Sequence, residues 1–578
     1  MQAHQNFSRI CFIISAAWLV VVGLLYYPKW QQPGSESTLS WDVHGYYSYL
    51  PATFIYQDLR GQAYKDSINQ RYRPASSAYE SYRDSASGNY VMKYSSGMAF
   101  AYLPFFAVGH LVAKLGPWPA DGYSAPYQAA VGIGSLLVAI FALYLFRRLL
   151  ARYFGPVATG IVLLLYVFGT NYLEYAAITN AMTHSYLFAL YCGLLLCTIR
   201  YYEAPTLKRA IGIGALIGWM ALIRPTEIAV LLLVLGWGVG NAAAFRERTR
   251  FFSQRWQHLL AAAALLLLVG GIQLMYWKYA TGHWLVYSYQ DEGFHFTHPH
   301  FDDCLWSFRK GWLVYTPLMI LPLIGFVALW RKSKALFWPI LLFTLLFCYL
   351  AFSWSTWWYG GGLGQRAVIQ IYPVLAFPFA ALLERIRRRW LQASLALFSA
   401  FCIYYNLWLH HQGHRGGLLE PEFMTYAYWK KIFLRYSVDD DARKLLDADY
   451  EYAGTPTCGE TTFQRDSIVF TPGSEFMTLG KTAAPPGKGW VRAYITASSA
   501  DREWDLWKYH QLCMQEWKDG AVVGRNQLRI ERLLSNNGPS TMWLDLKLKD
   551  EHDSVEIFIY NPGSQKQLTI SRLKTIAF

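Results

Sequence analysis

Asp42 and His44 are the first residues of the chain whose types and positions could carry chemistry. They lie in a polar and aromatic segment, WDVHGYYSYLP, shortly after the first long apolar run. A carboxylate held at a membrane surface can act as a general base that removes a proton from a hydroxyl group, and His44 and Tyr46 can bind a substrate beside it. The alternative is that these are polar residues at a membrane edge, next to a belt of tyrosines.

Three basic residues could bind an anion such as a phosphate. Arg366 follows the glycine-rich segment YGGGLGQ, where glycines let backbone NH groups approach an anion while the guanidinium donates two hydrogen bonds to it; the alternative is a flexible outer turn. Lys93 begins the segment KYSSG and is either a phosphate ligand or an ordinary interfacial lysine. Arg224 lies between two apolar runs, where an unpaired charge is costly, so it binds either Glu227 or a lipid phosphate.

Four more residues could contact the rest of a substrate. Asn180 and His184 lie in a predicted outer turn, and Trp358 and Tyr359 lie at the start of the glycine-rich segment. We predict substrate contacts for all four, although a helix cap would equally explain His184.

One loop carries side chains of the types that bind metals. These are His295, His298, His300, Asp302 and Asp303. Their spacing matches no strong zinc pattern, which favours a solvated loop. The segment at Asp42 is not an Asp-x-Asp pair, because position 44 is histidine. We therefore predict no metal site, and a divalent metal ion as cofactor is not favoured.

The elements that position these residues are membrane spans. The chain has 578 residues, of which 54% are hydrophobic and 17% aromatic, and its apolar residues form repeated runs. Several runs approach the roughly 20 residues needed to cross a bilayer, which predicts about eleven crossings in a polytopic α-helical membrane protein. The runs are 10–26, 127–146, 157–170, 186–199, 210–223, 228–239, 259–276, 312–330, 335–352, 367–383 and 391–409.

The basic clusters between these runs set the orientation. Successive clusters are separated by two crossings, so all of them can lie in the cytoplasm. They fall at 147–152, 200–209, 246–255, 331–334 and 385–389. If the stretch 99–112 also crossed, Asp42 would become cytoplasmic, but Pro104 and His110 favour an interfacial or re-entrant helix there. We therefore predict a cytoplasmic N-terminus and an outer loop at 27–126 with interfacial helices.

The composition changes near residue 447. Apolar and polar residues alternate in LDLKLK and VEIFI, a pattern typical of strands that are buried on one face. We predict a transmembrane domain at 1–409, a connector at 410–446 and an extracytoplasmic β-sandwich domain at 447–578. Cys458 and Cys513 can form a disulfide if this domain lies in an oxidising compartment.

The net charge of +14 does not indicate nucleic-acid binding. Many of the basic residues belong to the short clusters that record membrane orientation. The lipid bilayer is the partner that the composition predicts.

Taken together, these features resemble the GT-C superfamily of polyprenyl-phosphate-sugar glycosyltransferases, of the protein mannosyltransferase and aminoarabinose transferase type. The shared features are a single span, an outer loop that opens with an acidic residue, a KYSSG segment before a surface helix with Pro104, and alternating spans that end in an outer domain. The resemblance covers residues 9–409 and implies that Asp42 is the catalytic base and that Lys93 is the lysine before the surface helix. Such enzymes often carry an acidic residue in the second outer turn; TNAMTH has none, and Glu174 is the nearest substitute.

The resemblance implies an inverting glycosyltransferase of a bacterial-type inner membrane. It would move a sugar from a polyprenyl-phosphate donor to an envelope acceptor (a protein, lipid or glycan) on the outer face. A lipid phosphate is already a good leaving group, so one carboxylate can suffice, and the site must supply positive charge for the departing phosphate.

Two other functions stay open. A transporter or flippase would move lipid-linked sugar without chemistry, with inverted repeats and polar residues near the midplane. Alternatively, the outer β domain binds a glycan or a partner, and the membrane domain anchors it.

Overall fold

The computed structural model describes residues 2–578 except 76–79, 449, 455, 457–459, 473, 484–486, 502, 504, 536–537 and 550–552. The chain forms two compact units, Met1–His414 and Arg415–Phe578. The first unit ends beyond the predicted residue 409 because its last helix continues to His411. The predicted connector 410–446 belongs mostly to the second unit.

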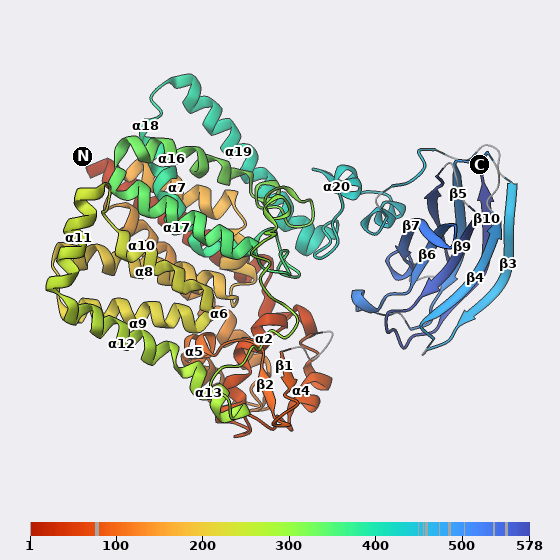
Figure 1. Ribbon diagram of the computed structural model, residues 1–578, viewed down its shortest axis with the longest axis horizontal. Coiled ribbons are helices and arrows are strands. Elements are labelled where there is room, and N and C mark those ends of the chain that lie inside the picture. The colour runs from red at the N-terminus through yellow and green to blue at the C-terminus, as the bar shows by residue number, and fades with distance from the viewer. Residues whose placement is uncertain are drawn as a thin grey trace. The chain divides into compact units, whose positions relative to one another are not determined.

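The first unit is helical apart from one short hairpin (Figure 1). Its helices are α1 (Gln2–Val20), α2 (Trp41–Tyr47), α3 (Tyr49–Phe54), α4 (Lys65–Tyr72), α5 (Gly97–Leu115), α6 (Ala125–Leu150), α7 (Pro156–Gly169), α8 (Thr183–Glu203), α9 (Leu207–Ile223), α10 (Val230–Gly236), α11 (Ala242–Gln254), α12 (Trp256–Gly270), α13 (Ile272–Thr281), α14 (Phe301–Trp306), α15 (Trp312–Tyr315), α16 (Ile320–Lys332), α17 (Lys334–Phe352), α18 (Tyr372–Arg385) and α19 (Arg389–His411). The hairpin pairs β1 (Ser81–Arg83) with β2 (Tyr90–Met92).

Among the described residues, six helical segments are long and apolar enough to cross a membrane. They are Asn6–Gln31, Gly97–Leu115, Ala125–Leu150, Trp256–Thr281, Lys334–Phe352 and Arg366–Arg385. Five coincide with predicted runs, and the sixth is α5, for which the sequence predicts an interfacial helix. The other six predicted runs are also largely helical, but none of them is both as long and as apolar as these six segments. The count of about eleven crossings and the interfacial position of α5 therefore stay predictions.

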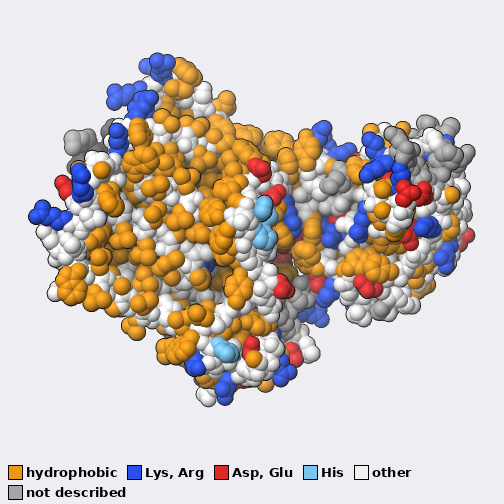
Figure 2. Space-filling view, in the orientation of Figure 1, with side chains coloured by type: hydrophobic (Ala, Val, Ile, Leu, Met, Phe, Trp, Pro, Cys, Tyr) orange, Lys and Arg blue, Asp and Glu red, His pale blue; other side chains and the backbone are white. Residues whose placement is uncertain are grey.

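Large apolar side chains are exposed on the helical unit, as expected of a membrane protein. In α12, Leu260, Leu267 and Leu268 are 61%, 70% and 69% exposed. Hydrophobic side chains cover much of the visible face of this unit (Figure 2). Patches of this extent are rare on soluble monomers and fit contact with lipid.

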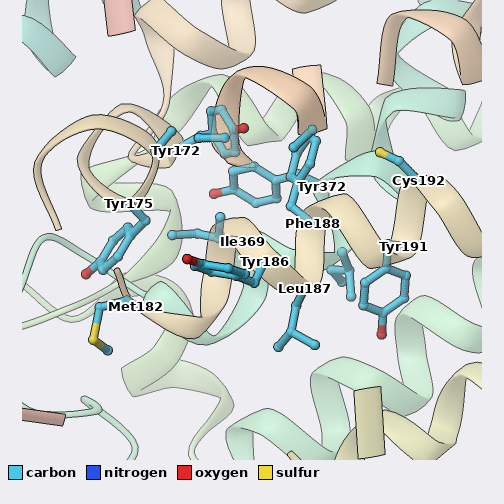
Figure 3. Packing of buried hydrophobic residues seen from close by; sticks show 14 of the residues in the cluster. Tyr172, Tyr175, Met182, Tyr186, Leu187, Phe188, Tyr191, Cys192, Ile369 and Tyr372 are labelled. Carbon is cyan, nitrogen blue, oxygen red and sulfur yellow. The ribbon is translucent and has the colours of Figure 1, made fainter. Parts of the chain in front are cut away.

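The interior of the helical unit is rich in tyrosine (Figure 3). Tyr172, Tyr191 and Tyr372 are fully buried around α8. The hydroxyl of Tyr372 donates to Asn171 Oδ1 at 2.8 Å, and that of Tyr191 donates to Glu227 Oε2 at 2.6 Å. These bonds satisfy polar groups that would otherwise be costly to bury.

The segments that carry Asp42 and Lys93 lie together at one end of this unit (Figure 1). Helix α2 packs against α5, and α13 packs against β2. The segment predicted to form the outer loop is therefore folded against the helices rather than extended.

The second unit contains α20 (Tyr426–Ile432) and two four-stranded antiparallel sheets. Their strand orders are β3-β10-β5-β8 and β4-β9-β6-β7. The strands are β3 (Glu460–Phe470), β4 (Phe476–Ala483), β5 (Trp490–Ser498), β6 (Gln511–Lys518), β7 (Ala521–Arg529), β8 (Ser540–Lys547), β9 (Ser554–Tyr560) and β10 (Leu568–Ala577). Both sheets contribute to one hydrophobic core, which is the arrangement of a β-sandwich. Cys513 is buried in β6, whereas Cys458 lies outside the described residues.

Candidate functional site

Asp42 lies in the first turn of α2. Negative side chains are favoured there because the helix N-terminus carries partial positive charge. The preceding residue, Trp41, has a φ of 51°, a conformation that residues other than glycine rarely adopt. Its backbone NH donates to the carbonyl of Pro74 at 3.0 Å, so the start of the helix is fixed to the outer loop.

Asp42 binds Arg366, although the two residues lie 324 positions apart in the sequence. Arg366 Nη2 is 2.6 Å from Asp42 Oδ2, and the two side chains are 14% and 17% exposed. The pair is therefore partly accessible from outside the protein. Arg366 Nε is buried and has no hydrogen-bond partner among the described residues, which is uncommon for a buried donor.

Tyr94 completes the surroundings of the carboxylate. Its hydroxyl donates to Asp42 Oδ1 at 2.8 Å, so each carboxylate oxygen has a partner. The ring of Tyr94 lies 4.5 Å from that of Tyr46, and the backbone carbonyl of Tyr94 accepts a hydrogen bond from Tyr49. Tyr94, which contacts Tyr46 and Tyr49, thus holds Asp42 in one orientation.

Arg224 belongs to the same group of residues. Burial raises the pKa of the Tyr46 hydroxyl, although the positive charge of the nearby Arg224 acts to lower it. Glu227, the alternative partner of Arg224, accepts hydrogen bonds from Tyr191 at 2.6 Å and Gln370 at 3.1 Å. Glu227 therefore has two hydrogen-bond partners other than Arg224.

Lys93 contacts the ring of Tyr94. Its Nζ is 2.5 Å from Glu292 Oε1 and lies over the rings of Tyr94 and Tyr289, at 5.9 and 5.6 Å from their centroids. Lys93 therefore adjoins the Asp42 site through the ring of Tyr94 but is bound to a carboxylate.

The glycine-rich segment before Arg366 is held at two successive carbonyls. Lys310 Nζ donates to the carbonyl of Gly362, and Asn171 Nδ2 donates to that of Leu363 at 3.2 Å. Gly362 and Gly364 have φ values of 127° and 63°, which glycine adopts at little cost. The segment therefore has a specific shape that presents Arg366 to Asp42.

Replacing Gly364 by Ala should displace Arg366 and weaken the site. A Cβ at Gly364 would lie 2.7 Å from Tyr315 Cβ, and the left-handed backbone alone costs about 1–2 kcal/mol. Gly282→Ala is the matched control, because Gly282 has a φ of +82° but no heavy atom within 4 Å of the added carbon. We expect a lower thermal unfolding midpoint in detergent for Gly364→Ala than for Gly282→Ala. Equal midpoints would show that the contact with Tyr315 is unimportant.

Asn180 and His184 have partners of their own within the helical core. Asn180 Nδ2 donates to the carbonyl of Gly132 at 3.0 Å. His184 is buried in the first turn of α8, and its Nδ1 lies 3.1 Å from Gln370 Oε1. The structure does not join either side chain to Asp42 by a hydrogen bond or an ion pair among the described residues.

Trp358 and Tyr359 are held by contacts around the glycine-rich segment. The guanidinium of Arg309 lies 3.8 Å from the ring centroid of Trp358. The hydroxyl of Tyr359 donates to the carbonyl of Ala351 at 2.7 Å. These contacts support the segment that leads to Arg366.

His44 is directed away from Asp42 into a charged cluster of the outer loop. Its Nε2 is 3.7 Å from Glu80 Oε1, and Lys65 Nζ is 3.4 Å from the same oxygen. The ring stacks on Tyr123 at 5.3 Å. Burial alone would raise the pKa of Glu80, but His44 and Lys65 outweigh it and lower this pKa to about 2.

The Glu80 cluster predicts a pH-dependent stability. The pKa of Glu80 in the folded protein is about 2, below its usual value of 4.5, so the carboxylate stabilises the fold above pH 4.5 and loses this contribution as the pH falls towards 2. A shift of this size corresponds to about 3 kcal/mol. Glu80→Gln should therefore lower the thermal unfolding midpoint at pH 6, with a difference from wild type that shrinks at pH 3. A difference independent of pH would contradict this account.

Glu174, the nearest acidic residue to the predicted second outer turn, begins the short helical segment Glu174–Ile178 between α7 and α8. It is buried, and its Oε2 lies 2.8 Å from His414 Nε2 and 3.7 Å from His410 Nε2. Burial opposes ionisation, but the two histidines lower the pKa of Glu174 to about 2. The next residue, Tyr175, donates to the carbonyl of Leu363 in the glycine-rich segment. Glu174 therefore supports the site from the neighbouring turn.

The histidine-rich loop forms pairs of side chains. His295 Nδ1 lies 3.4 Å from His300 Nε2, and His300 Nδ1 lies 3.4 Å from Asp303 Oδ2. In the part of the chain that the structure describes, no group of three or more His, Cys, Asp or Glu side chains could hold a metal ion.

Three residues at the site have no predicted role from the sequence. Tyr94 could have been found through its position next to Lys93, since both lie in the KYSSG segment. Tyr289 and Glu292 lie in an irregular loop, where no periodicity indicates which side chains turn inward.

Fold and site together describe a helical membrane protein with a β domain and a carboxylate–guanidinium pair between residues 42 and 366. No protein-family model matches the chain, and no curated protein matches it. Among solved structures, it is similar to the single-particle cryo-EM structure of arabinosyltransferase EmbB from Mycobacterium smegmatis, with 12% sequence identity and a TM-score of 0.31. The match covers 82% of this chain and 59% of that one, so the chain spans less than two thirds of EmbB.

Proposed function

We propose that this protein is a GT-C-type glycosyltransferase that uses a polyprenyl-phosphate-linked sugar as its donor. The observation that supports this most strongly is the contact between Asp42 and Arg366, at 2.6 Å. A general base and a phosphate ligand that meet at one partly exposed position provide both functions that the transfer requires.

Arg366 is the principal ligand of the donor phosphate. Its buried Nε has no partner among the described residues, so this NH can donate to a phosphate oxygen together with an Nη group, as guanidinium groups commonly do. Arg224, beside Tyr46, adds a second positive charge. Lys93 can bind the phosphate only after it is released from Glu292. Of the three basic residues, it is therefore the least favoured phosphate ligand.

Asp42 is the base that activates the acceptor. It accepts the proton of an acceptor hydroxyl while that oxygen forms a bond to the anomeric carbon of the sugar. The bond between this carbon and the phosphate oxygen breaks, and polyprenyl phosphate leaves with the electron pair. A single displacement of this kind inverts the anomeric centre.

Donor binding and base activation are coupled through the ion pair. In the structure Asp42 is bound to Arg366, so a phosphate that binds Arg366 competes with the carboxylate. The donor thereby frees Asp42 for the acceptor, while Tyr94 keeps it in place. The enzyme therefore holds its base paired until the donor has bound.

The test is an assay with purified full-length protein and polyprenyl-phosphate donors carrying labelled sugars. Release of polyprenyl phosphate with label on a membrane or envelope acceptor is the expected result. Label that crosses a liposome without cleavage would instead identify a transporter. Donors that differ in their sugar, tested in parallel, identify the one that is used.

A further inference from the structure

A second charged site lies at the other end of the helical unit, where α6 and α8 end side by side. It is a cavity of about 550 Å³, lined by Tyr144, Arg147, Arg148, Ala151, Arg152, Leu196 and Arg200. This volume falls within the range of pockets that hold small ligands. From this cavity we infer that the protein binds the head group of an anionic phospholipid.

The charge of the cavity favours an anion. Four of its seven lining residues are arginines. Arg152 binds Glu203 through two nitrogens, at 3.1 and 3.3 Å. Arg147 donates to Ser8 Oγ and Arg148 to the hydroxyl of Tyr144, both neutral groups. Within the described residues, the four guanidiniums thus share one carboxylate in ion-pair contact, which leaves an excess of positive charge for a phosphodiester.

The position of the cavity fits a membrane surface. At the opposite end of α6, Gln128 accepts a hydrogen bond from the backbone of Leu39, three residues before Asp42. Gln128 and Arg148 are separated by 20 residues of helix, or about 30 Å at 1.5 Å per residue. This equals the approximate thickness of the hydrocarbon core of a bilayer, so the cavity lies at the leaflet opposite the Asp42 site.

An apolar stripe runs from the cavity towards the middle of α6. It favours a lipid over a free anion as the ligand of the cavity. Leu137, Phe141, Tyr144 and Arg148 follow one another at helical spacing, so they share one face. Leu137 and Phe141 are 59% and 54% exposed, and the rings of Phe141 and Tyr144 stack at 6.3 Å. A head group bound by the arginines would place its acyl chains along this stripe. Basic pockets between membrane helices are known to bind such head groups.

The test measures lipid binding to the purified full-length protein by native mass spectrometry. The probes are phosphatidylglycerol, the zwitterionic phosphatidylcholine and inorganic phosphate. We expect tighter binding of phosphatidylglycerol than of phosphatidylcholine, and a loss of about tenfold or more in Arg148→Gln/Arg200→Gln, since each arginine near a membrane surface contributes roughly 1 kcal/mol. Arg387→Gln/Arg388→Gln is the matched control, because it removes the same charge from exposed arginines outside the cavity lining, and it should leave binding unchanged.

Several outcomes would overturn the inference. Equal losses in both double variants would indicate diffuse charge rather than a site. Displacement of phosphatidylglycerol by an equal concentration of inorganic phosphate would identify a free-anion site. Glu203→Gln gives an independent test if the arginine variant does not fold. This change removes the carboxylate that binds Arg152, so it should strengthen binding of phosphatidylglycerol, and an unchanged affinity would contradict the proposal.

Discussion

Replacing Asp42 by Asn is expected to abolish sugar transfer while donor binding is kept or tightened, because no carboxylate then competes with the donor phosphate for Arg366. Asparagine has nearly the same shape and keeps one oxygen that can accept from Tyr94 or Arg366, but it cannot take a proton from an acceptor hydroxyl. Loss of a general base typically costs 10²–10⁴ in rate. The measurement is the rate of polyprenyl phosphate release at saturating donor, together with the donor dissociation constant.

Asp66→Asn is the matched control for this variant. Asp66 lies in the same outer loop, in the first turn of α4, and is exposed. The variant makes the same chemical change at a residue that has no proposed role. Its turnover should therefore equal that of the wild-type enzyme. Turnover in Asp42→Asn close to the wild-type rate would refute the role of Asp42 as base.

Replacing Arg366 by Gln is expected to weaken donor binding as well as to slow sugar transfer. Removal of one group that stabilises charge in the transition state commonly lowers the rate by 10²–10³, and here the donor phosphate also loses its ligand. We therefore expect a raised KM for the donor together with a lowered kcat. Arg366→Lys should recover part of the activity, because lysine keeps the charge but not the paired donor geometry. Wild-type donor affinity in Arg366→Gln would contradict this role.

A double-mutant cycle separates this account from a purely structural ion pair. Removing one partner of a largely buried pair such as this one destabilises a protein because the other charge is left uncompensated, whereas removing both is often tolerated. Thermal unfolding midpoints in detergent should therefore be restored in Asp42→Asn/Arg366→Gln. If the pair were only structural, transfer would return with stability in the double variant; we expect transfer to stay absent.

Much of the helical architecture could be predicted from the sequence, because lipid leaves few options for a chain that crosses it. The apolar runs form helices, since every backbone polar group must be satisfied within a spanning segment. The alternating patterns LDLKLK and VEIFI lie in or overlap β8 and β9. The number of crossings was less predictable, because helices such as α7 and α10 are shorter than a typical span.

The sequence predicts that Asp42 and Arg366 lie on the same face of the membrane, but it predicts neither their contact nor their other partners. Both residues lie on loops that the basic clusters assign to one face, so the sequence could indicate that they share a surface. No sequence pattern near these residues predicts that Glu292 binds Lys93 or that His44 contacts Glu80. Such partners come from irregular loops, where contacts depend on the folded chain rather than on a periodic pattern.

A structure with a polyprenyl-phosphate-linked sugar bound tests the central claim most directly. We expect a phosphate oxygen within hydrogen-bonding distance of Arg366, the Asp42–Arg366 contact broken, and the anomeric carbon facing the freed carboxylate. A donor bound elsewhere, with Asp42 still paired to Arg366 at the present 2.6 Å, would contradict it.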